Sequence, residues 1–316
     1  MAAAKPSTDR VLIIFPGALG DLICVLPALQ AVARRYRGCS FELMARAELA
    51  DFAVDRMGVA RGHSIDRREL SLLFSPADDA TVQAAEFFGP FAAIHSFFGA
   101  GDSRLRETLP LACRGKVFFH PFRPEAQGHI SAAYLQAVGE EDAASIIELQ
   151  RPVLEFTAAD LAEARRIAGD FGAHGGSYVL LMPGSGSPAK NWPIESYLNL
   201  AHHLAQSAAL LIVLGPAETH LEKTFSHFAT ISNPTLGALA GLARYSSAFV
   251  GNDSGVSHLA AAAGGCGVVI FGPTDPARWR PLGAVAVLQR MPLRELHWLE
   301  VARAIEAILR RAESRH

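Results

Sequence analysis

The chain has 316 residues, of which 50% are hydrophobic and 19% are charged, and its formal net charge is −2. This composition is typical of a globular protein, and the mixture of acidic and basic residues argues against a nucleic-acid-binding surface. Because domains commonly contain about 100–150 residues, the length predicts two of them. We place them at residues 1–156 and 157–316, with the join in an extended segment that contains Pro152.

The chain also lacks the sequence signals of export and of a membrane span. Its four cysteines show no paired metal-binding spacing, which favours free thiols in a reducing compartment (Cys24, Cys39, Cys113, Cys266). The segment before Val11 is short and polar, and the apolar run 11–15 is too short for a signal peptide. The longest uncharged stretch, 254–274, is interrupted by glycines. We therefore expect a cytoplasmic protein.

The first half alternates apolar runs with helical patterns. Strands are predicted at residues 11–15, 41–44, near 64–65, 91–97 and 116–119, and helices after residue 21 and over residues 45–57. Strands that are apolar throughout, with helices between them, indicate a parallel sheet covered on both faces.

The second half repeats this alternation. Strands are predicted at residues 178–182, 209–214, 248–251 and 268–271, and helices at 161–171, 194–206, 218–228, 235–246, 255–263 and 293–311. Two doubly wound α/β domains in tandem are expected to leave a cleft between them. Ligands of such sheets bind in the loops that follow the strands, so those loops should carry the functional residues.

The loop Pro16–Asp21 follows the first strand. Gly17 and Gly20 allow the backbone to turn and to approach a ligand. Asp21 lies at the start of the following helix, where an aspartate is a favourable cap. The alternative is a carboxylate that takes a proton from an attacking hydroxyl.

The loop Pro183–Pro193 matches neither a Walker loop nor a GxGxxG motif. Its small residues are nevertheless suited to wrapping a diphosphate, with Ser185 and Ser187 as hydrogen-bond donors and Lys190 as the positive charge. The alternative for Lys190 is an ordinary surface lysine.

Two more loops follow strands of the second half. In residues 251–258, the amides of residues 254–257 would form an anion site at a helix N-terminus, with His258 one turn further on. A lone helical histidine is otherwise a packing residue. The loop 271–281 is rich in turn formers and contains Thr274, Arg278 and Arg280.

Taken together and in order, four motifs resemble glycosyltransferase family 9, the ADP-heptose:lipopolysaccharide heptosyltransferase family. They are Gly-Ala-Leu-Gly20-Asp21, Pro-Gly-Ser…Lys190-Asn-Trp-Pro193, Asn-Asp253-Ser254-Gly255-Val-Ser-His258 and Phe-Gly-Pro-Thr274-Asp-Pro. The resemblance implies an α/β protein of the GT-B fold, with two Rossmann-like domains facing across a cleft. The first would bind the acceptor and the second the nucleotide sugar, and the last helix would pack back toward the first domain.

The resemblance also implies roles for single residues in an inverting transfer that needs no metal and no cofactor. Asp21 matches the family's proposed base, and Gly17, Gly20 and Thr274 belong to loops near the substrates. Residues matched to donor binding are Ser185, Ser187, Lys190, Glu218 (on the ribose), Asp253, Ser254, Gly255 and His258. No Asp-x-Asp motif for a diphosphate-bound metal is present.

The implied partners are a nucleotide diphosphate sugar, with ADP-heptose as the first candidate, and the hydroxyl of a lipopolysaccharide-core-like or other glycan. No nucleic acid is expected. A lipid-linked acceptor would imply peripheral contact with the cytoplasmic face of the membrane. Candidates for touching an anionic acceptor, each also readable as a solvated loop residue, are His95, Arg104, Arg106, His120, Arg123 and His129.

Two other functions stay open at this point. One is a nucleotide-sugar 2-epimerase of the same architecture, which would need no acceptor. The other is a non-catalytic nucleotide-sugar-binding protein, against which Asp21 argues. An NAD-dependent dehydrogenase is disfavoured, because neither half has a GxGxxG motif after its first strand.

Overall fold

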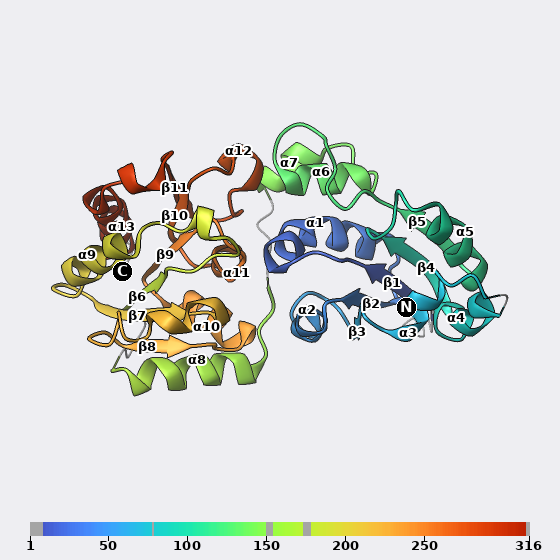
Figure 1. Cartoon of the computed structure of the whole chain (residues 1–316), viewed down its shortest axis with the longest axis horizontal. Helices are drawn as coiled ribbons and strands as arrows, with labels where there is room; N and C mark the ends of the chain where they lie inside the picture. The colour runs from blue at the N-terminus through green and yellow to red at the C-terminus, as the bar shows by residue number, and fades with distance from the viewer. Residues whose placement is uncertain (1–8, 78, 150–153, 173–177, 314–316) are drawn as a thin grey trace, which may run out of the picture. The chain divides into compact units, whose positions relative to one another are not determined.

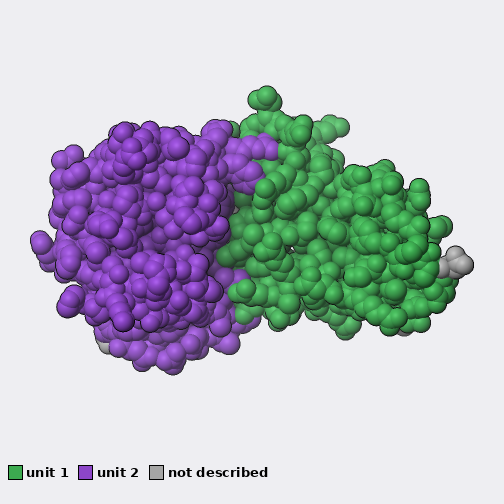
Figure 2. Space-filling model, in the orientation of Figure 1, with its two compact units in different colours: residues 1–150 green, residues 151–316 purple. Residues whose placement is uncertain are grey.

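The computed structural model describes residues 9–77, 79–149, 154–172 and 178–313. The chain divides into two compact units, which are coloured separately in Figure 2: unit 1 (residues 1–150) and unit 2 (residues 151–316). The predicted join near residues 151–159 lies partly outside the described residues, so the boundary after residue 156 stays a prediction.

Unit 1 contains a parallel five-stranded sheet in the order β3-β2-β1-β4-β5 (Figure 1). Its strands are β1 (Arg10–Ile14), β2 (Ser40–Ala45), β3 (Arg61–Ser64), β4 (Phe91–Ser96) and β5 (Lys116–Phe119). Its helices are α1 (Leu19–Arg35), α2 (Ala47–Ala53), α3 (Arg68–Leu72), α4 (Ala80–Phe88), α5 (Ser103–Ala112), α6 (Ile130–Ala137) and α7 (Ala143–Leu149).

The central strand of unit 1 shows why this sheet forms. Residues 11–14 of β1 are all buried, as expected for a parallel strand covered on both faces. Leu12 and Ile14 pack in a cluster with Phe88 of α4 and Leu105 of α5. Helix α1, which leaves β1, packs against α6.

Unit 2 contains a parallel six-stranded sheet in the order β11-β10-β9-β6-β7-β8 (Figure 1). Its strands are β6 (Tyr178–Met182), β7 (Ala209–Leu214), β8 (Thr230–Ser232), β9 (Ala248–Asn252), β10 (Gly267–Phe271) and β11 (Val285–Gln289). Its α-helices are α8 (Ala158–Asp170), α9 (Ile194–Leu204), α10 (Leu236–Tyr245), α11 (Gly255–Ala262), α12 (Pro276–Trp279) and α13 (Trp298–Glu313), and its 3-10 helices are η2 (Pro188–Lys190), η3 (Pro216–Leu221) and η4 (Leu293–Glu295).

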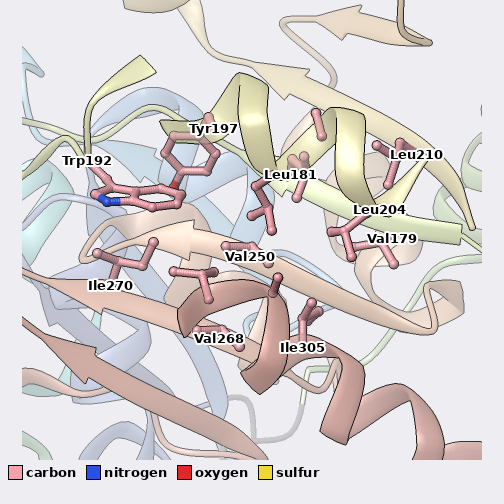
Figure 3. Close-up of a cluster of buried hydrophobic side chains, with 14 of the residues drawn as sticks. Val179, Leu181, Trp192, Tyr197, Leu204, Leu210, Val250, Val268, Ile270 and Ile305 are labelled. Atoms are coloured by element: carbon pink, nitrogen blue, oxygen red, sulfur yellow. The ribbon is translucent and has the colours of Figure 1, made fainter. Parts of the chain in front are cut away.

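The core of unit 2 lies between its sheet and two helices, α9 and α13. Val179 of β6 and Val250 of β9 pack there against Tyr197 of α9 and Ile305 of α13 (Figure 3). Helix α13 contacts β9, β10 and α9, whereas α10 packs against α8 and α11. The predicted packing of the last helix toward the first domain stays a prediction.

Both sheets confirm the predicted α/β class of two Rossmann-like halves. Counted from its own first strand, unit 2 has the order 3-2-1-4-5-6 when read from β8, the order of dinucleotide-binding domains. Unit 1 has the first five positions of the same order. In each unit the chain reverses direction across the sheet between the first and fourth strands, β1 and β4 or β6 and β9.

One local prediction for unit 2 was wrong, and two short strands were missed. The helix predicted over 218–228 is instead the short 3-10 helix η3 followed by turns. The backbone hydrogen bonds of this segment differ in span: the Glu222 N–H donates to Thr219, three residues back, whereas the Phe225 N–H donates to Leu221, four residues back. Strands β8 and β11 were not predicted at all.

The described helices were also compared with the requirements of a membrane span. None of them is both long enough and apolar enough to cross a bilayer. The four cysteines are all free, as predicted.

Candidate functional site

The two places where the strand order reverses are where each unit is expected to bind a ligand, at the carboxyl ends of the strands. In unit 2 the loops that leave β6 and β9 carry the Lys190 and Asp253 motifs. In unit 1 the loop that leaves β1 leads into the first turn of α1, which carries Asp21. The predicted residues therefore form two groups, one in each unit.

Lys190 and Asp253 meet directly in unit 2. Lys190 Nζ lies 2.7 Å from Asp253 Oδ2, although the two residues are 63 positions apart. The Lys190 side chain is 33% exposed and that of Asp253 only 6%. Asp253 is thus buried, while a third of the Lys190 side chain remains exposed. This position is not that of an ordinary surface lysine.

The start of α11 forms the next part of the site. Ser254 is the N-cap residue, and its Oγ accepts from the Ser257 N–H. Of the four amides predicted to bind an anion, that of Ser257 is therefore already capped. The amides of Gly255 and Val256, at the first two helical positions, have no intrahelical partner, as in any helix.

His258 lies in the first turn of α11 and is 5% exposed. Its side chain is thus buried rather than displayed at the helix N-terminus. Its backbone N–H donates to the Ser254 carbonyl within the helix.

Glu218 follows β7 and is buried against glycine backbone. A Cβ on Gly184 would lie 2.3 Å from Glu218 Cδ, and one on Gly215 would lie 2.8 Å from its Oε2. Neither glycine has a positive φ, so the need for glycine there is steric. The Glu218 carboxylate therefore lies next to the Lys190-bearing loop, at the carboxyl end of β7.

Ser185, Ser187 and Thr274 complete the predicted group in unit 2. The Ser185 hydroxyl lies 2.6 Å from Asn191 Oδ1 and 2.8 Å from the Ser187 carbonyl oxygen, so it organises the loop itself. Thr274 follows β10, and its carbonyl accepts from Gln289 Nε2 of β11.

In unit 1, Asp21 is in the first turn of α1 and is 8% exposed. Its Oδ2 accepts from the Ala18 N–H at 3.2 Å, so the capping contact is present. Arg123 Nη2 also lies 3.3 Å from both carboxylate oxygens. Gly17 is required by close packing, because a Cβ there would lie 2.7 Å from Asp21 Cβ.

Three of the candidates for acceptor contact are buried histidines. His95 Nδ1 lies 3.0 Å from His120 Nε2, and His95 Nε2 lies 3.1 Å from Tyr36 Oη. Burial lowers the pKa of His95 to about 3. His129 caps α6 by accepting from the Ser131 N–H. Reading these three as solvated loop residues was wrong.

The arginine candidates differ from the histidines because they are exposed. Arg106 lies over the Phe119 ring and donates to the Ala100 carbonyl, and Arg104 donates to the Ser75 carbonyl. Of the six candidates for acceptor contact, Arg123 is the one that the structure brings to Asp21.

Asn252, which is fully buried at the end of β9, is a site residue that was not predicted. Its side chain makes hydrogen bonds to both ends of the loop that carries Lys190. An amide that ends an otherwise apolar strand, directly before Asp253, is a signal that could have marked it. Within the described residues, no group of three His, Cys, Asp or Glu side chains is arranged to hold a metal ion.

Comparisons with known proteins bear on the family and the fold of this chain. The family model of glycosyltransferase family 9 (heptosyltransferase) matches residues 132–303. No curated protein matches the sequence at a significant level.

Solved structures of this family are similar over nearly the whole chain. ADP-heptose lipopolysaccharide heptosyltransferase II of E. coli has a TM-score of 0.76 at 17% identity, over 96% of this chain and 99% of that one. A family 9 glycosyltransferase of Veillonella parvula has a TM-score of 0.78 at 16% identity, over 98% and 100%. E. coli heptosyltransferase WaaC with ADP has a TM-score of 0.68 at 20% identity, over 95% and 99%.

At these identities the solved structures establish the GT-B fold, while the family model covers more than half of the chain. The motif loops, the strand order and the family match agree. The chain therefore belongs to glycosyltransferase family 9 and is a glycosyltransferase of the heptosyltransferase type.

Proposed function

We propose that this glycosyltransferase moves a sugar, heptose from ADP-heptose, onto a hydroxyl of a lipopolysaccharide-core-like glycan acceptor. The observation that carries the proposal is the group in unit 2 at the ends of β6, β7 and β9. There a lysine, the start of a helix and a buried carboxylate lie close together, as a diphosphate and a ribose would require. ADP as the nucleotide is supported by the E. coli structures described with ADP or with ADP-heptose in their names.

In the proposed reaction the acceptor hydroxyl attacks the anomeric carbon from the face opposite the diphosphate, so that the configuration inverts. Asp21 accepts the hydroxyl proton as the new C–O bond forms and the bond to the diphosphate breaks. Lys190 and the amides at the start of α11 stabilise the charge that develops on the leaving diphosphate. Glu218 binds the ribose hydroxyls, while Asp253, Ser254, Gly255 and His258 shape the donor loop, with Ser185, Ser187 and Thr274 in the neighbouring loops.

The same proposal assigns a separate substrate to each unit: unit 1 binds the acceptor, and unit 2 binds the donor. Arg123 beside Asp21 is suited to an anionic acceptor. An acceptor carried on a lipid would bring the protein to the cytoplasmic face of the membrane as a peripheral protein.

A thermal-shift titration with ADP, UDP and GDP tests the donor site. We expect ADP to stabilise the wild type most and to lose most of its effect in Lys190→Ala. The same variant should lose about 2–4 kcal/mol of transition-state stabilisation in a transfer assay, as when one preorganised donor is removed. Selective stabilisation by UDP, together with epimerised sugar nucleotide formed without acceptor, would instead identify a 2-epimerase. Nucleotide binding without turnover on any acceptor would identify a non-catalytic binding protein.

A further inference from the structure

Asn252 has a set of hydrogen bonds that fixes its orientation. Its Oδ1 accepts from the Trp192 backbone N–H at 3.1 Å, and its Nδ2 donates to the Pro183 carbonyl at 2.7 Å. A carbonyl only accepts and a backbone N–H only donates, so the side-chain amide fits in one orientation alone. The residue is fully buried, which makes the loss of either bond costly.

These two bonds hold the ends of one loop. Pro183 directly follows β6, and Trp192 lies two residues after Lys190. The loop between them is therefore attached at both ends to the last residue of β9. The residue directly after β9 is Asp253, whose carboxylate accepts from the Lys190 ammonium at 2.7 Å. Asn252 thus fixes the backbone of the loop, while its neighbour holds the lysine side chain.

The same oxygen of Asn252 accepts a second hydrogen bond from the core of unit 2. Tyr197 of α9 also donates its hydroxyl to Asn252 Oδ1, at 3.1 Å. The Trp192 and Tyr197 rings pack edge to face with centroids 4.9 Å apart (Figure 3), and Trp192 Nε1 donates to the Leu296 carbonyl at 3.0 Å. The Asn252 side chain and the Trp192 end of the Lys190 loop are therefore anchored in the core of unit 2.

The same residue also contacts the start of α11. Ser257 Oγ donates to the Asn252 backbone carbonyl at 2.6 Å, and Gly251 leaves room for this contact, since a Cβ there would lie 2.4 Å from Ser257 Oγ. One residue therefore sets the distance between the Lys190 loop and the helix start, the two elements assigned above to the diphosphate.

We propose that Asn252 is a positioning residue that places the Lys190 ammonium for the diphosphate without touching the nucleotide. The inference rests on the proposed role of Lys190 in donor binding. The proposal distinguishes two contributions to nucleotide affinity. Contacts to the phosphates should depend on Asn252, whereas contacts to the nucleoside should not.

The test compares Asn252→Ala with the wild type, using whichever of ADP, UDP and GDP the wild type binds most tightly and the matching nucleoside. By calorimetry we expect the dissociation constant of the nucleotide to rise about tenfold, because bonds to charged groups contribute more than neutral ones. That of the nucleoside should stay within about twofold. In the Lys190→Ala background, Asn252→Ala should add little, since both changes remove the same contact.

Equal weakening of nucleotide and nucleoside, or effects of the two substitutions that multiply, would overturn the positioning role while leaving the donor site in place. A wild type that binds none of the three nucleotides would overturn both the donor site and this inference. Asp102→Ala is the matched control, because it removes a hydrogen bond to the Leu105 N–H at the start of α5, in unit 1 rather than in the unit that carries the Lys190 loop. It should lower thermal stability and leave the ratio of nucleotide to nucleoside affinity unchanged.

If Asn252→Ala does not fold, Tyr197→Phe takes its place, since it removes one bond to Asn252 Oδ1 and retains the ring. A smaller rise in the nucleotide dissociation constant alone is expected, and it should again vanish in the Lys190→Ala background. A nucleotide affinity equal to that of the wild type, or an equal loss for the nucleoside, would contradict the inference.

Discussion

Asp21 is a capping residue by its contact with the Ala18 N–H, and by its place beside Arg123 it is also a candidate base. Asp21→Asn separates these roles, because asparagine retains an oxygen that accepts from an N–H but cannot take up a proton at neutral pH. We expect a melting temperature close to that of the wild type and a transfer rate lower by about 100-fold or more. Steady-state kinetics at saturating donor measures the loss.

The matched control for this substitution is in unit 2. Asp160 occupies the same position in the first turn of α8 and accepts from the Thr157 N–H at 3.0 Å. Asp160→Asn should therefore have a similar effect on stability and none on the rate. Wild-type turnover in Asp21→Asn would leave Asp21 as a helix cap only.

Gly184 and Glu218 form a second contact in which one added methyl group is expected to change nucleotide binding. A methyl group at Gly184 would lie 2.3 Å from Glu218 Cδ, so Gly184→Ala must displace the carboxylate. We expect nucleotide and nucleoside affinities to fall together, by about tenfold, as for one lost hydrogen bond to a charged group. Isothermal titration measures both.

Gly186, two residues along the same loop, supplies the control. A Cβ there would meet nothing within 4 Å, so Gly186→Ala should bind nucleoside as the wild type does. If Gly184→Ala also binds nucleoside normally, Glu218 does not contact the ribose.

At the scale of elements, α8 begins with a capping box. Thr157 Oγ1 accepts from the Asp160 N–H at 3.1 Å, while Asp160 accepts from the Thr157 N–H. Thr157→Ala should lower the free energy of unfolding by about 1 kcal/mol, the usual contribution of such a cap. Urea denaturation followed by circular dichroism measures it, and nucleotide affinity should not change. A cap variant as stable as the wild type would contradict the expectation.

The sequence predicted those elements that carry their own apolar pattern. Strands β5, β6 and β7 have the predicted bounds. Strands β6 and β7 are apolar runs that become buried between neighbouring strands, whereas β5 is a partly exposed edge strand that its apolar residues 117–119 were enough to mark. Strand β8 has three half-buried residues, Thr230–Ser232, and it exists through its pairing with β7. A short edge strand of this kind depends on a partner that is distant in sequence.

The same distinction applies to the candidate site. Loops that follow strands were predictable from strand positions and glycine content, and they include Lys190 and Asp253. The contact between those two side chains, and that between Asp21 and Arg123, join residues 63 and 102 positions apart. Helix η3 was mispredicted because Leu221, Phe225 and Phe228 have helical spacing although their segment turns irregularly.

At the scale of the whole molecule, two buried groups of unit 1, His95 and Glu42, are expected to contribute to the response to acid. Burial lowers the pKa of His95 to about 3, with further contributions from His120 and Arg35. The folded state therefore holds His95 neutral, while the unfolded chain binds a proton below about pH 6.5. Stability is fully present above that pH and falls toward pH 3, by at most about 1.4 kcal/mol per pH unit for this group.

Glu42 acts in a lower pH window. Burial alone would raise its pKa, but hydrogen bonds from His63 and Arg10 bring it to about 2. Its contribution is present above about pH 4.5 and is lost as the pH falls toward 2. Urea unfolding at pH 7.5, 5.5 and 4.5 should show the first loss, and His95→Gln should flatten the slope between pH 6.5 and 5. An unchanged slope would assign the acid sensitivity to other groups.

Trp192, buried in the core at the end of the Lys190 loop, is one of the tryptophans that make unit 2 optically distinct. All three tryptophans of the chain, Trp192, Trp279 and Trp298, belong to unit 2. Light of a wavelength that tryptophan absorbs and tyrosine does not would therefore excite unit 2 and not unit 1. The tryptophan fluorescence of this protein therefore reports on unit 2, the half that carries Lys190.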